Sequence, residues 1–565
     1  MKRCKKAWLA ILLCLTAAFG VVGLGGCDDE KTPSESSSES VESSLESAAE
    51  ESSSESEQQE SGLKYKLVSG GGAYEVVGYK GSEKDVVIAD TYGGFPVTGI
   101  AANAFKGSTL RSVVIPDSVD AIGKGAFQAS LDLEGVTIGQ CVTEIGSSAF
   151  LGCKNLTEIA LPSGVSEIEA STFSGCTALK AVTIPETVTE IGAYAFYNCK
   201  NLAEITLPEG LKKLGAYVFY NCGELKRVEI PSGVSSIGNY SFYNCDKLES
   251  VSMPEGLSSI GFYAFFHCKS LQSIVIPDGV TEIKSRTFYE CEALKSVKMG
   301  TGVVSIAENA FAGCVKLSEM ELPDGVTHIG ESAFYDCRAL KTVTIPDGVE
   351  SLPLGVFLGC RSLESLTLGR GLKTLDAYVF AECTALKTVS IPDGLMWLEN
   401  GVFFGCENLQ YNVYKGLLYL GNAGNPYVAL VKAGDRTWES YEIHEDTKLV
   451  LEYAFRGCEN LKSIVIPDGV VALGKGAFEN CSALESAVIG RGVKTVGSST
   501  FSCCYALKNV YYRGLATDWN AVTLGSHNFK QAYSKWHYYV ENQEEIPADG
   551  GRYWHYDANG EIAVW

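Results

Sequence analysis

A strict 23-residue repeat is the feature that most constrains the fold of this chain. Phenylalanine returns at that interval in thirteen consecutive copies, and the period resumes for three more copies after one interruption. A unit this short cannot bury its apolar side chains alone, so it is stable only when it stacks on its neighbours. The sequence therefore predicts a solenoid with a continuous core. The repeating residues are Phe127, Phe150, Phe173, Phe196, Phe219, Phe242, Phe265, Phe288, Phe311, Phe334, Phe357, Phe380, Phe403, Phe455, Phe478 and Phe501.

A single copy shows how each unit is built. The copy that begins at Leu271 reads LQSIVIPDGVTEIKSRTFYEC. Leu271, Ile274 and Ile276 have the spacing of a short strand whose side chains point into the core. The Pro-Asp-Gly that follows ends this strand, because proline lacks an N–H donor and glycine permits a tight turn. A second apolar pair, the phenylalanine and the cysteine then close the coil.

This unit, L-x-x-I-x-IP-x-x-V-x-x-I-G-x-x-AF-x-x-C, resembles the BspA-type leucine-rich repeat of bacterial surface proteins. The match covers about residues 100 to 510. The resemblance implies an α/β-type repeat solenoid that is mostly β, an arc of about 17 coils with the 23-residue period. It also implies a secreted or surface-anchored adhesin that binds host matrix proteins, other bacteria or mucosal surfaces, and it identifies no catalytic residues.

The changes in composition along the chain predict seven segments. They are a lipoprotein signal peptide (1–26), an acidic Ser/Glu-rich disordered stalk (27–62), a β-rich N-terminal cap (63–100), leucine-rich repeats (101–410), an irregular island (411–447), further repeats (448–510) and a C-terminal cap or tail with a Trp-rich hairpin (511–565).

The N-terminus predicts an exported protein. Four basic residues precede an apolar run from Ala7 to Leu24, and the run ends in Leu-Gly-Gly-Cys27, which is the layout of a signal peptide. This tetrad resembles the bacterial lipobox and so implies a diacylglycerol on Cys27. A plain signal peptide and an uncleaved anchor helix are the alternatives. The predicted location is the extracellular face of the bacterial cell membrane, with the lipid anchor as the only membrane contact.

The acidic composition narrows the range of partners. The formal net charge is −22, and the stalk is almost entirely Ser, Glu, Ala and Gln, so its like charges should keep it extended. A negative surface repels polyanions. We therefore expect no nucleic-acid partner.

Cysteine also repeats with the period, from Cys153 to Cys504. Spacing of 23 residues is not the paired C-x-x-C pattern of a zinc site. Neighbouring coils would bring the α-carbons within disulfide distance, but an inward column of reduced thiols, packed as small apolar groups, is the simpler interpretation. Counting thiols would decide between the two.

No motif predicts catalysis, a metal or a cofactor. Residues 469–475 match most of a phosphate-binding loop, but Gly476 replaces the hydroxyl residue that would hold magnesium. The histidines form no H-E-x-x-H motif, and no G-x-S-x-G elbow is present. The sequence therefore predicts a binding protein and not an enzyme.

Two irregular segments leave their roles open. The island is either a binding insertion or a degenerate coil, with a hairpin expected around Asn422 to Pro426. The tail is either a cap over the last coil or a small element that binds cell wall or glycan.

Aromatic residues mark the candidate binding site. They occupy two turn positions beside the core phenylalanine in consecutive coils, whereas later coils carry polar residues there. If the rings face outward they form a contiguous strip of the kind that contacts proteins or glycans; alternatively they stack on one another and only shield the turn. The strip consists of Tyr194, Tyr197, Tyr217, Tyr220, Tyr240, Tyr243, Tyr263, Phe266 and Tyr289.

The predicted partner is a protein or glycan on the host, on other bacteria or on the cell's own envelope. The predicted function is cell-surface binding or adhesion through the solenoid. The alternative function is a structural module of the envelope that binds the organism's own wall or a partner protein.

Overall fold

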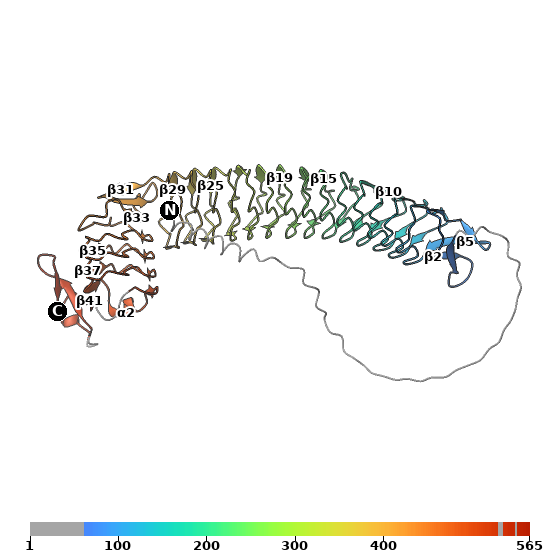
Figure 1. The fold of residues 1–565 in the computed structure, drawn as a ribbon. Helices are drawn as coiled ribbons and strands as arrows, with labels where there is room; N and C mark the ends of the chain where they lie inside the picture. Colours follow the sequence, from blue (N-terminus) through green and yellow to red (C-terminus); the bar gives the residue numbers. More distant parts are fainter. Residues whose placement is uncertain (1–61, 529–534, 548–550) are drawn as a thin grey trace, which may run out of the picture. The chain divides into compact units, whose positions relative to one another are not determined.

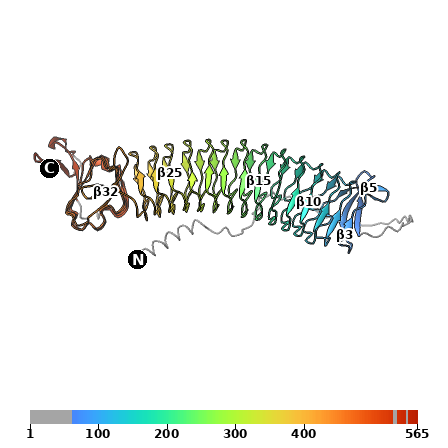
Figure 2. The same ribbon diagram turned by 90° about the horizontal axis from the view of Figure 1, so that it is seen from above.

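The computed structural model describes residues 62–528, 535–547 and 551–565. The predicted signal peptide, the stalk up to residue 61 and Cys27 lie outside these residues. The described chain is a mostly β solenoid of about 20 turns, each of about 23 residues, as the sequence predicts (Figures 1 and 2). The turns outnumber the 17 expected coils because irregular segments at the ends and at the island also stack on the repeats.

One ladder of strands is formed by the L-x-x-I-x-I segment of nearly every coil, with residues 203–208 as an exception, and neighbouring strands pair in parallel. The middle residue of a typical three-residue strand is buried and its two neighbours are exposed. The members are β3 (Asp85–Val87), β6 (Ser112–Val114), β8 (Gly135–Thr137), β10 (Glu158–Ala160), β12 (Ala181–Thr183), β15 (Arg227–Glu229), β17 (Ser250–Ser252), β19 (Ser273–Val275), β21 (Ser296–Lys298), β23 (Glu319–Met320), β25 (Thr342–Thr344), β27 (Ser365–Thr367), β29 (Thr388–Ser390), β35 (Ser463–Ile466), β37 (Ser486–Ile489) and β39 (Asn509–Tyr512).

A second parallel ladder is formed by two-residue strands that follow the Pro-Asp-Gly turn. These strands typically end in an inward Ile, Leu or Val, as the apolar spacing predicts, except in β40 (Thr523–Leu524), where Leu524 is exposed. The members are β7 (Ala121–Ile122), β9 (Glu144–Ile145), β11 (Glu167–Ile168), β13 (Glu190–Ile191), β14 (Lys213–Leu214), β16 (Ser236–Ile237), β18 (Ser259–Ile260), β20 (Glu282–Ile283), β22 (Ser305–Ile306), β24 (His328–Ile329), β26 (Ser351–Leu352), β28 (Thr374–Leu375), β30 (Trp397–Leu398), β34 (Leu449–Val450), β36 (Ala472–Leu473), β38 (Thr495–Val496) and β40 (Thr523–Leu524).

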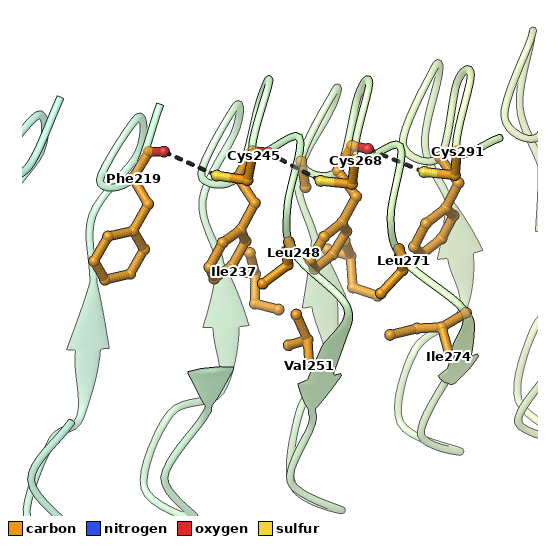
Figure 3. Packing of buried hydrophobic residues seen from close by; sticks show 14 of the residues in the cluster. Phe219, Ile237, Cys245, Leu248, Val251, Cys268, Leu271, Ile274 and Cys291 are labelled. Atoms are coloured by element: carbon orange, nitrogen blue, oxygen red, sulfur yellow. Dashed lines mark hydrogen bonds between the residues drawn. The ribbon is translucent and has the colours of Figure 1, made fainter. Parts of the chain in front are cut away.

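The core between the ladders is a column of stacked phenylalanines. From Phe105 to Phe403 consecutive rings are stacked with centroids 4.9 to 5.9 Å apart, at interplanar angles of 12° or less except for 26° between Phe219 and Phe242. Leucine, isoleucine and valine from both ladders pack around them (Figure 3). Each fully buried side chain contributes roughly 1.5–3 kcal/mol, so this column is the main stabilising element of the fold.

The cysteines line the same core as free thiols. Fourteen of the periodic thiols donate a hydrogen bond to the carbonyl oxygen of the phenylalanine 26 residues earlier, as from Cys245 Sγ to Phe219 at 3.1 Å (Figure 3), whereas Cys458 has Lys432 at that position. Burial raises the pKa of these thiols, to about 12 at Cys153. The column therefore links neighbouring coils through neutral S–H donors, which agrees with the interpretation as reduced thiols.

Short added strands cover the first coil. In the N-terminal segment, β1 (Leu63–Leu67) pairs antiparallel with β2 (Tyr74–Tyr79). Strand β2 in turn pairs in parallel with β5 (Phe95–Ile100), which carries the second ladder onward to β7, and β4 (Thr91–Tyr92) pairs antiparallel with β5.

The C-terminal segment extends the first ladder past the repeats. Strand β41 (Lys535–Tyr539) pairs with β39, followed by β42 (Tyr553–Tyr556) and the antiparallel β43 (Ile562–Val564). The helix α2 (Ala516–Trp519) and the 3-10 helix η1 (Gln543–Glu545) connect these strands. Trp554 is fully buried and donates from Nε1 to the carbonyl of Tyr512 at 3.0 Å. These contacts cover the end of the core.

The island continues both ladders in irregular form. Strands β31 (Asn412–Tyr414), β32 (Leu417–Leu420) and β33 (Ala429–Ala433) form an antiparallel meander, with the predicted hairpin between β32 and β33. Strand β33 then pairs in parallel with β34. The side-chain oxygen of Asn422 accepts hydrogen bonds from the N–H groups of Gly424 and Asn425, which shapes the hairpin loop.

Candidate functional site

The aromatic strip lies on the turn that follows the second ladder. In each of its coils two residues, four positions apart, have positive φ, and at the first of them Tyr194, Tyr217 and Tyr240 have φ of 61°, 58° and 57°. This geometry lets the turn N–H groups point along the solenoid: Tyr194 N–H donates to the Ala216 carbonyl at 3.0 Å. Positive φ is unfavourable for bulky side chains, and the ring stacking offsets part of this cost within the strip.

The rings stack face to face in two columns. In the first column the centroids from Tyr194 to Tyr263 are 4.6, 4.7 and 4.8 Å apart, with interplanar angles of 9 to 10°. In the second column, from Tyr197 through Phe266 to Tyr289, they are 4.6 to 4.9 Å apart, at 15° or less. Rings of the two columns also meet within a coil, at 5.5 to 5.9 Å.

Charged side chains lie at one end of the strip. Arg286 lies over the ring of Tyr263 at 5.6 Å, donates to its hydroxyl at 2.9 Å and pairs with Glu308 at 2.8 Å. His267 stacks on Phe266 and lies 2.7 Å from a carboxylate oxygen of Glu290. By contrast, residues 192–198, 215–221 and 238–244 include no Asp, Glu, Lys or Arg. The strip is therefore an uncharged patch on an acidic chain.

The rings are half-buried, apart from Tyr194, which is 39% exposed. Burial raises the pKa of Tyr217 and Tyr240, and raises that of Tyr220 to about 12. The hydroxyls of Tyr217, Tyr220 and Tyr240 consequently stay protonated at any physiological pH. All nine predicted residues thus lie together, stacked as one of the two sequence interpretations expects, with their outer edges partly accessible.

Two grooves on the first ladder carry no signal in the sequence. One, of about 890 Å³, lies where residues 203–208 form no strand, and Glu204, Arg227 and Glu229 line it. Another, of about 510 Å³, lies between β29 and the island loop, and Thr388 and Asn422 contribute to its lining. The larger groove arises because residues 203–208 do not pair with the ladder. That depends on the exact path of the backbone in one coil, which a sequence repeat does not reveal.

The described residues contain no group of three or more His, Cys, Asp or Glu placed to hold a metal ion. Residues 469–475, whose sequence matches most of a phosphate-binding loop, form an ordinary turn and the strand β36. Across the described ranges, no helix has the length and apolarity needed to cross a bilayer.

These features define a leucine-rich-repeat solenoid. The description "BspA type Leucine rich repeat region (6 copies)" matches residues 98–223, 166–295, 281–410 and 434–546. These ranges span more than half of the chain, so the protein belongs to this family. Members of the family are repeat scaffolds and not enzymes, and they are typically found at the cell surface.

Three solved structures illustrate the similarity. A leucine-rich repeat protein from Bacteroides ovatus is 22% identical, over 84% of this chain and 98% of that one, with a TM-score of 0.47. A leucine-rich repeat protein of T. pallidum is 28% identical, over 38% and 91%, with a TM-score of 0.29. A leucine rich cell surface protein from Faecalibacterium prausnitzii is 22% identical, over 83% and 98%, with a TM-score of 0.22. Comparison with curated proteins gives no match.

Proposed function

We propose that this protein is a lipid-anchored adhesin or ligand-capturing protein of the bacterial cell surface, and that it binds its partner through the aromatic strip. The observation that carries this proposal is the clustering of nine stacked rings in five consecutive coils. The core does not require them, since Ser171, Asn309 and Gly355 occupy the first turn position in other coils. Tyrosine-rich uncharged patches are typical of interface centres.

The anchor supports the same proposal. The lipobox-like Cys27 and the acidic stalk would hold the solenoid at a distance from the membrane. Replacing Cys27 by Ala should release the protein or leave its precursor uncleaved. Unchanged processing together with unchanged detergent partitioning would refute the anchor while leaving the strip untouched.

Binding can be tested with the full chain, labelled and applied to matrix proteins, mucin glycans and the producer's own cell wall. We expect Tyr217→Ala with Tyr240→Ala to weaken binding by more than tenfold, because aromatic truncations at interface centres typically cost about 2 kcal/mol or more. Tyr378→Ala is the matched control, since Tyr378 has the same position and φ (59°) outside the strip.

Normal binding by the double variant would move the search to the two grooves. Binding to the cell's own wall alone would favour the alternative function, a structural module of the envelope.

A further inference from the structure

The stacking leaves almost no free ring face in the strip. Sugar rings are held on aromatic side chains through C–H groups that pack on the electron-rich face of the ring. Here Tyr217 and Tyr240 have stacked rings on both sides, with centroids 4.6 to 4.8 Å away. In the second column Tyr220 and Tyr243 are enclosed in the same way, at 4.6 to 4.8 Å.

The rings at the ends of the columns do not provide free faces on which a sugar chain could stack. Arg286 lies over Tyr263 at the end of the first column. At the other end the preceding coil carries Ser171 and Ser174 at the two ring positions. The first ring of each column, Tyr194 or Tyr197, therefore offers at most one ring face, which is too little for a run of sugar units.

The edges of the rings are the accessible part of the strip. A ring edge is electropositive, and each phenol adds a hydroxyl donor. The hydroxyl of Tyr240 has no protein hydrogen-bond partner among the described residues, and that of Tyr263 accepts from Arg286 and so keeps its own proton. Burial raises the pKa of Tyr217 and Tyr240, so both hydroxyls carry their protons; the Tyr217 hydroxyl also hydrogen-bonds to its stacked neighbour Tyr194, so the two hydroxyls face a partner as a linked pair.

An open row of donors alone would bind free sugars weakly, since each sugar hydroxyl would exchange one hydrogen bond with water for another. A protein surface also brings apolar side chains that exclude water around the same hydrogen bonds. The absence of charge over residues 215–221 and 238–244 favours an uncharged partner surface that presents carbonyl or amide oxygens.

We propose that the strip recognises a protein partner through its tyrosine hydroxyls and ring edges, and that it does not stack carbohydrate. This inference rests on the proposed function, because it names the class of partner at the same site. It assigns specificity to the hydroxyls of Tyr217 and Tyr240, whose rings are otherwise fixed by their neighbours.

The discriminating change is Tyr217→Phe with Tyr240→Phe, which removes two hydroxyls and keeps every stacked face. The fold accepts phenylalanine in such a stack, as Phe266 shows. The probes for the full chain are an array of bacterially expressed, unglycosylated proteins, and the oligosaccharides chitohexaose, cellohexaose and mucin O-glycans. Tyr378→Phe is the matched control at the same coil position outside the strip.

We expect binding to unglycosylated protein that falls roughly tenfold in the double Phe variant, as for two lost hydrogen bonds. The melting temperature, the Tyr378→Phe control and the dependence on salt should change little. The inference would be overturned if oligosaccharides bind the Phe variant but not the Tyr217→Ala with Tyr240→Ala variant. The proposed function would stand in that case. If no probe binds in a tyrosine-dependent way, the proposed function fails as well.

Discussion

The buried thiol column predicts that this protein loses stability steeply at alkaline pH. Fourteen of its cysteines are buried, and desolvation raises the pKa of their thiols, to about 12 at Cys153 and Cys406. In the unfolded chain the same thiols ionise near the ordinary cysteine pKa of about 9. The unfolded state therefore releases protons first as pH rises, so the stabilisation is complete below about pH 8 and is lost through pH 9 and above.

The size of this effect follows from the number of thiols. A thiol that is ionised only in the unfolded state lowers the free energy of unfolding by about 1.4 kcal/mol for each pH unit above its unfolded pKa. At about pH 10 the fourteen buried thiols together remove on the order of 20 kcal/mol. At about 0.05–0.15 kcal/mol per residue, the roughly 500 described residues correspond to a stability of about 25–75 kcal/mol, so the thiols remove a large share of it. We therefore expect the free energy of unfolding to fall steeply between about pH 8 and pH 10.

The assay is urea unfolding followed by circular dichroism, with a reductant present, between about pH 7 and 10. Replacing Cys245 and Cys268 by Ala removes two of the fourteen buried thiols, so the slope of unfolding free energy against pH should fall by about one seventh. At neutral pH the variant should be less stable, because the carbonyls of Phe219 and Phe242 each lose a thiol donor. A free energy of unfolding that stays constant up to pH 10 would refute the reasoning, and would indicate disulfides or ionised thiols in place of the neutral column.

Three further predictions concern the core, the coil contacts and the C-terminal segment. Phe242→Ala removes a fully buried ring from the stack and should lower the free energy of unfolding by about 3–5 kcal/mol, measured by chemical denaturation. Gly238→Ala would place a Cβ 2.7 Å from backbone atoms of the preceding coil and should lower the melting temperature, whereas Gly135→Ala, whose Cβ meets nothing within 4 Å, should leave it unchanged. Trp554→Phe removes the hydrogen bond to the Tyr512 carbonyl, and faster amide exchange in β39 and β41 should report the loosened segment.

The sequence by itself determined the repeat, and with it most of the fold. Identical spacing of Phe, Leu and Ile reports which residues occupy equivalent places in successive coils, and only stacking can bury such units. The phenylalanine column, the inward cysteines and the two apolar segments of each coil all follow from that equivalence. The same periodicity brings the nine strip residues together, because positions 23 residues apart must lie one above the other.

Only the tertiary structure decided which part of each strip residue meets the solvent. The direction of the rings depends on the positive φ of residues such as Tyr217 and on a coil spacing that brings ring centroids to 4.6–4.9 Å. Neither quantity is encoded in the period, because Asn, Ser and Gly adopt the same φ in other coils. For the same reason the groove beside residues 203–208 and the pairing of β33 with β34 could not be predicted. They depend on small departures of the backbone from the repeat, whereas periodicity describes only what successive coils share.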